Sequence, residues 1–95
     1  MKEVTNIPVV RLDFRPGQPT GMHRHPVTAI GYVLEGEFVF KIQGQAEQHY
    51  ATGDSIYEPA NMTIERFGNA SDSQPASVIA HYPASEDEPE LIKFL

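Results

Sequence analysis

The sequence has no cysteine among its 95 residues. Disulfide bonds, thiolate metal sites and a cysteine nucleophile are therefore excluded. It also has no run approaching the roughly 20 apolar residues that a membrane span needs, and its first residues lack the apolar core of a signal peptide. Together these absences predict a cytoplasmic protein without a membrane partner.

Basic residues are scarce as well. The chain has 7 lysines and arginines against 13 acidic residues, which gives a formal net charge of -6. A surface with this balance repels a phosphate backbone, so we expect no nucleic-acid partner. Much of the acidic excess lies at positions 86–90 and is expected to favour solubility.

Apolar residues at helical spacing are also missing, as are a glycine-rich phosphate loop and a nucleophile elbow. Short alternating runs are present instead, separated by Gly, Pro, Asn and Asp, and this pattern favours a β-sandwich or barrel. In the first run Val10, Leu12 and Phe14 alternate with polar residues. A second run is broken near Pro26, and Glu35-Gly36-Glu37 is predicted to be a hairpin turn.

The length permits one domain, which we place at 1–95. The barrel is predicted to cover about 9–82, followed by an acidic linker and an apolar tail over 83–95. Left exposed, the apolar run from Leu91 to Leu95 would favour aggregation. We therefore expect it to pack on the barrel or on a second subunit.

His23-Arg24-His25 is the most chemically informative segment. Alternate side chains of a strand point to the same face, so the two histidines are predicted to lie side by side. A pair of neutral imidazoles can hold a divalent metal such as Zn, Fe or Ni.

The sequence around this pair resembles the cupin family. The first cupin motif is Gly, five residues, His-x-His, three or four residues, Glu, six residues and Gly, and here Gly17, His23, His25 and Gly36 are in register. In the second motif, Gly53 and Pro59 match. The resemblance runs from about Val10 to Tyr82 and implies an all-β double-stranded β-helix, a small jelly-roll barrel.

The departures from the family pattern bear on function. Ala29 occupies the position of the family's Glu ligand, Ile64 that of its second-motif His ligand, and Asn61 that of a glycine. Two histidines are too few for a tight site, since catalytic metal centres generally keep three protein ligands. The pattern predicts a degenerate centre in which Zn, Mn, Fe or Ni is weakly bound or absent.

Glu58 offers a way to complete the set. Its strand parity would let its carboxylate join His23 and His25 in a two-His, one-carboxylate site. The alternative is a rim residue bonded to Arg66 or to a backbone amide. His49 and His81 are further candidate ligands, although each is interpreted first as an ordinary strand residue.

The same parity predicts a small pocket with a polar histidine end and an apolar end, suited to a small organic ligand. Its predicted lining residues are Ala29, Gly31, Tyr32, Phe38, Phe40, Ile64 and Arg66. The alternative is that these side chains fill a narrow barrel.

Three functions remain open from the sequence. The leading hypothesis is a cupin barrel that binds a small molecule or a weakly held divalent metal. The second is a metal-dependent dioxygenase or isomerase that uses His23, His25 and Glu58, as the resemblance implies. The third is a sensor or accessory module.

We predict a homodimer, because exposed apolar edges and the C-terminal tail need cover. Light scattering at tens of micromolar protein should give the mass of two chains. A monodisperse single-chain mass would contradict the prediction.

Overall fold

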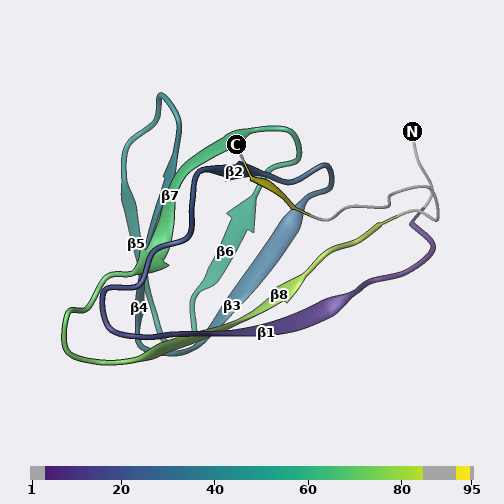
Figure 1. Ribbon diagram of the computed structural model, residues 1–95. Helices are drawn as coiled ribbons and strands as arrows, with labels where there is room; N and C mark the ends of the chain where they lie inside the picture. Colours follow the sequence, from purple (N-terminus) through teal and green to yellow (C-terminus); the bar gives the residue numbers. More distant parts are fainter. Residues whose placement is uncertain (1–3, 85–91, 95) are drawn as a thin grey trace.

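The computed structural model, which describes residues 4–84 and 92–94, is built from antiparallel β-strands (Figure 1). Its strands are β1 (Val9–Phe14), β2 (His23–Arg24), β3 (Ala29–Glu35), β4 (Glu37–Ile42), β5 (Gln48–Ala51), β6 (Ser55–Glu58), β7 (Thr63–Asn69), β8 (Ala76–His81) and β9 (Lys93–Phe94). The predicted all-β class is confirmed. In the described part of the chain, no helix has the length and hydropathy to cross a membrane.

The strands form two sheets with the orders β1-β8-β3-β6 and β5-β4-β7-β2-β9. Each pairing is antiparallel, and strands adjacent in a sheet are mostly distant in sequence, such as β1 with β8. This arrangement is the predicted double-stranded β-helix, a jelly roll whose two sheets enclose the core.

The core follows from the alternation of apolar residues. On β8, Ala76, Val78 and Ala80 are buried and point into the space between the sheets. In that space the rings of Phe14 and Phe67 both pack against Phe38, and each ring centroid lies 5.2 Å from that of Phe38. The centroids of Phe14 and Phe67 are 5.8 Å apart. Aromatic contacts of this kind add to the stabilisation from burial. The end occupied by these rings is filled, which leaves the other end for the histidines.

Gly36 connects the two sheets, so the prediction of a hairpin at Glu35-Gly36-Glu37 was wrong. β3 pairs with β6 and β8, whereas β4 pairs with β5 and β7. Gly36 has φ 85°, and a Cβ there would lie 2.7 Å from the Pro75 carbonyl oxygen. Only glycine fits this crossover, because an L side chain would be strained and would collide with the neighbouring backbone.

Contacts with the body of the fold continue beyond the predicted barrel boundary at 82. Ala84 is buried, and its backbone is hydrogen-bonded to Thr5 and Asn6. The predicted linker therefore does not begin at 83, and its acidic part lies outside the described residues. In the tail, β9 pairs with β2, so this segment packs on the barrel, as one of the two sequence-based alternatives proposed.

The outer face of the β1-β8-β3-β6 sheet carries exposed apolar side chains. Val9, Ile30, Tyr32 and Tyr57 are among them. This face offers an apolar surface that a second subunit could cover, and the homodimer stays a prediction.

Asp13 on β1 supplies a test of how the sheet depends on pH. The Ser77 hydroxyl donates to its carboxylate at 2.6 Å, and this bond, with help from Arg11, lowers the pKa of Asp13. A lowered folded-state pKa means that the unfolded chain binds more protons, so this contribution is present above about pH 3.9 and is lost as the pH falls through the folded pKa. Asp13→Asn should therefore flatten the acid side of the stability profile, measured by urea unfolding across a pH series. Asp72→Asn, on an exposed loop, is the matched control, and equal profiles for the two variants would contradict the assignment.

Candidate metal centre

His23 and His25 both point into the barrel, as predicted from their alternation. Each is 2% exposed, and Arg24 between them is exposed. Their rings meet edge to face with centroids 5.0 Å apart. β2 holds His23 in place from two sides, because its register sets His23 opposite Ile64 of β7 and Phe94 of β9.

A backbone carbonyl fixes the orientation of the His23 ring. The His23 Nδ1 lies 2.8 Å from the carbonyl oxygen of Gly21. A carbonyl only accepts, so Nδ1 carries the proton and donates it. The lone pair is then on Nε2, which is the arrangement found in metal-binding histidines.

Glu58 lies inside the barrel beside the histidines. The alternation on β6 buries Ile56 and Glu58, and Glu58 is only 8% exposed. Its Oε2 lies 2.6 Å from the Nε2 of His25. The two ligand atoms are thus near enough to each other to bind one metal ion.

The structure excludes the pairing of Glu58 with Arg66 that was the sequence-based alternative. Arg66 is on the outside of β7 and donates to Glu47 at 2.7 Å. Glu58 instead lies opposite Ala29 in the ladder between β3 and β6. Ala29 is where the family pattern has its glutamate, so a carboxylate is present beside that position, on the adjacent strand.

The three side chains fit a metal ion. One ligand atom from each of His23, His25 and Glu58 lies within 4.8 Å of the others, and all three residues are buried. Ligands about 2.1 Å from one metal are about 3 Å apart at right angles. The His25 Nε2 and Glu58 Oε2 atoms, 2.6 Å apart, are already near this spacing, and a metal would draw the His23 ligand atom toward them. The group could thus hold a divalent ion with coordination positions left open.

The turn after Glu58 ties this carboxylate to the histidine loop. The backbone N–H of Asn61 donates to the carbonyl oxygen of His25 at 2.8 Å. Asn61 has φ 62°, a left-handed conformation that asparagine tolerates better than most residues. The departure from glycine at this position is therefore conservative for the backbone, and the turn holds Glu58 and His25 together.

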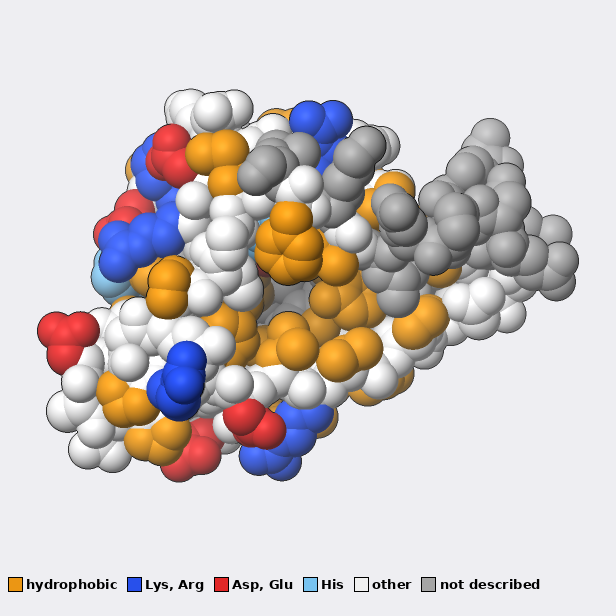
Figure 2. Space-filling model, in the orientation of Figure 1, with side chains coloured by type: hydrophobic (Ala, Val, Ile, Leu, Met, Phe, Trp, Pro, Cys, Tyr) orange, Lys and Arg blue, Asp and Glu red, His pale blue; other side chains and the backbone are white. Residues whose placement is uncertain are grey.

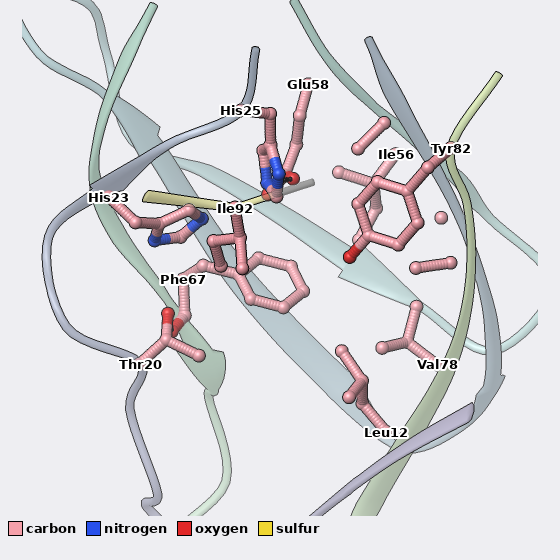
Figure 3. Close-up of a pocket in the computed structure, with 13 residues that line it drawn as sticks. Leu12, Thr20, His23, His25, Ile56, Glu58, Phe67, Val78, Tyr82 and Ile92 are labelled. Carbon is pink, nitrogen blue, oxygen red and sulfur yellow. Dashed lines mark hydrogen bonds and ion pairs between the residues drawn. The ribbon is translucent and has the colours of Figure 1, made fainter. Parts of the chain in front are cut away.

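His23, His25 and Glu58, the metal triad, lie at one end of a cavity of about 40 Å³. Figure 3 shows its lining side chains converging from both sheets, and Figure 2 shows hydrophobic side chains around a hollow on this face. The lining residues are Leu12, Thr20, His23, His25, Ala29, Gly31, Ile56, Glu58, Phe67, Val78, Ala80, Tyr82 and Ile92.

The structure divides the predicted pocket residues into three groups. Ala29 and Gly31 line the cavity. Phe38, Phe40 and Ile64 belong to the hydrophobic core beside it and are not among its lining residues. For these three the alternative, that they fill the barrel, describes the structure better.

The predictions for Tyr32 and Arg66 were wrong. Tyr32 is 45% exposed, because it alternates with the inward-facing Gly31 and Val33. Arg66 faces outward for the same reason, between the buried Ile64 and Phe67.

His49 and His81 lie away from the triad. His49 is exposed and contacts Glu47 at 3.2 Å. His81 faces outward on β8, where its Nδ1 lies 3.4 Å from the carbonyl oxygen of Ile30. Both are strand residues without a place in the centre, as their first interpretation held.

Sequence reasoning missed most of the cavity wall. Leu12, Val78 and Ala80 could have been found from alternation within β1 and β8. Thr20 and Ile92 lie in a loop and in the tail, where no periodic signal exists.

Tyr82 follows β8 and is also part of this wall. Its hydroxyl oxygen is directed into the cavity (Figure 3). Burial, and then the negative charge of Glu58, raises the pKa of Tyr82, so its hydroxyl stays protonated at neutral pH and can donate a hydrogen bond.

The sequence over residues 10–82 matches the family model described as Cupin domain. No curated protein is significantly similar in sequence.

Solved structures with this fold include a cupin-like protein from Thermotoga maritima, with 23% identity and a TM-score of 0.80 over 97% of this chain and 66% of that one. An oxalate oxidase in complex with the substrate analogue glycolate has 24% identity and a TM-score of 0.78 over 94% of this chain and 46% of its own. The DMSP lyase DddQ from Ruegeria pomeroyi has 17% identity and a TM-score of 0.78 over 93% of this chain and 42% of its own. The present chain spans less than two thirds of each of them.

Asn61 gives a test of the turn that supports the site. Asn61→Ala should lower the free energy of unfolding by about 1 kcal/mol, because alanine is strained in the left-handed conformation. Asn61→Gly should leave it unchanged or raise it slightly, since glycine adopts the same φ without strain. Urea unfolding of the three proteins measures the difference. Equal stability of the alanine and glycine variants would show that the left-handed turn is not required.

Proposed function

Because this chain belongs to the cupin family, we propose that it binds a divalent transition metal through His23, His25 and Glu58 and takes a small molecule at the remaining coordination positions. The observation that carries this proposal is the burial of three converging donors at the end of a cavity. Two histidines and one carboxylate suit Fe and Zn, and Mn and Ni are accommodated by the same ligand types. When bound, the ion would polarise an oxygen of the small molecule.

In this proposed centre the carboxylate ligand is not lost but comes from Glu58, on the strand beside position 29. In an antiparallel ladder, residues directly opposite each other have Cβ atoms about 5 Å apart. Glu58, opposite Ala29, can therefore bring its carboxylate to the space that a glutamate at 29 would reach. A third ligand on a different strand would raise the metal affinity above that of the two-histidine centre predicted from the sequence.

An enzyme is the second candidate function. Three protein ligands with open positions are characteristic of catalytic rather than structural metal sites. An oxalate oxidase and a DMSP lyase have the same fold, so the fold is compatible with different enzymatic reactions. A metal-dependent dioxygenase or isomerase remains the form proposed from the sequence, and a sensor role has no feature of the described residues in its favour. The cytoplasmic location stays a prediction.

Moving the carboxylate from position 58 to position 29 tests the proposal directly. Native protein should gain about 10–20 °C in melting temperature with Zn, Fe, Mn or Ni at a hundredfold excess over Kd. Glu58→Ala should lose most of this gain. The double variant Ala29→Glu, Glu58→Ala should recover it, because the carboxylate returns from the opposite residue of the ladder.

Glu37→Gln is the matched control, since Glu37 is exposed on β4 and should not affect the metal response. A full metal response in Glu58→Ala would refute the role of Glu58.

A further inference from the structure

Beyond the two histidines and Glu58, the described lining of the cavity carries no charge that could meet a charged ligand. Among its described lining residues there is no lysine or arginine, and Glu58 is the sole carboxylate. The remaining wall consists largely of apolar side chains such as Leu12, Ile56 and Val78. A charged group on a ligand would therefore have to be balanced at the metal itself.

The charge of the loaded centre follows from its ligands. A divalent ion contributes two positive charges, the Glu58 carboxylate removes one, and metal-bound histidines are neutral. One positive charge is left in an apolar enclosure, where an unbalanced charge is costly. A ligand with one negative charge would neutralise it, and a ligand with two would leave a new unbalanced charge.

The hydroxyl groups of the wall determine where a ligand can accept a hydrogen bond. The described lining residues with a hydroxyl are Thr20 and Tyr82. The Thr20 hydroxyl donates to the backbone carbonyl of Phe67 at 2.8 Å. The Tyr82 hydroxyl points into the cavity and is the remaining donor among the described lining residues (Figure 3).

The size of the cavity limits the ligand. A volume of about 40 Å³ accommodates about three water-sized groups. Gly31 and Ala29 leave this room beside the triad, and a Cβ added at Gly31 would already lie 3.2 Å from Val78. A compact anion with a short apolar body fits these limits.

We propose that the cavity binds a short-chain monocarboxylate, with one carboxylate oxygen at the metal and a hydrogen bond donated by the Tyr82 hydroxyl. The proposal rests on the metal centre proposed above and adds the charge and size of its ligand. Tyr82 acts as a positioning residue for the anion, and the apolar wall holds its alkyl chain.

The test uses the full chain loaded with the metal that gives the largest melting shift. Propionate and propionamide are titrated by calorimetry, because they have the same number of non-hydrogen atoms and carry one and no negative charge. Propionate should bind more than about tenfold tighter than propionamide, since it alone balances the centre. Propionamide binding as tightly as propionate would overturn the charge argument.

Tyr82→Phe should weaken propionate binding about tenfold through loss of one hydrogen bond to a charged acceptor, while the metal-dependent melting shift is retained. Tyr57→Phe, on the exposed outer face of β6, is the matched control and should bind propionate like the native chain. Unchanged affinity in Tyr82→Phe would overturn the role of Tyr82. A normal metal shift without propionate binding would overturn this inference alone, whereas absence of the metal shift would overturn it together with the proposed function.

Discussion

The ladder between β3 and β6 sets Ala29 opposite Glu58, and the composition of the candidate centre depends on that register. Side chains alternate across a sheet, so a slip of one residue would turn Glu58 outward and bring Tyr57 in. The buried Ile56 on the same face opposes such a slip, because it would be carried into solvent. Core packing thus enforces the position of the carboxylate, and the site follows from the fold rather than from the local sequence.

The alternation of the sequence was sufficient to predict the strands and the shared face of His23 and His25, whereas the choice of a jelly-roll barrel over a sandwich came from the resemblance to the cupin family. It could not decide between Glu58 inside and Glu58 on the rim, because that depends on which strand lies beside which. The same limit explains the error at Gly36, where a glycine between two strands serves a hairpin and a crossover equally well. Thr20 and Ile92 come from segments without a period, so only the assembled barrel reveals them as cavity residues.

Backbone groups orient the candidate ligands. The Gly21 carbonyl sets the tautomer of His23, and the Asn61 N–H holds the loop that carries His25. In both contacts a backbone carbonyl is the acceptor, so each contact depends on loop geometry. Substitutions in these loops can therefore change the centre without altering any of its three ligands.

The pairing of β1 with β8 and of β2 with β9 also governs when the site can form. Contacts between strands so far apart in sequence carry a high cost in loop-closure entropy, and domains rich in them fold slowly. During synthesis the histidines emerge well before Glu58 and before the strands that enclose them. The nascent chain thus exposes two imidazoles at first, and the candidate three-ligand site is assembled only after the barrel has closed.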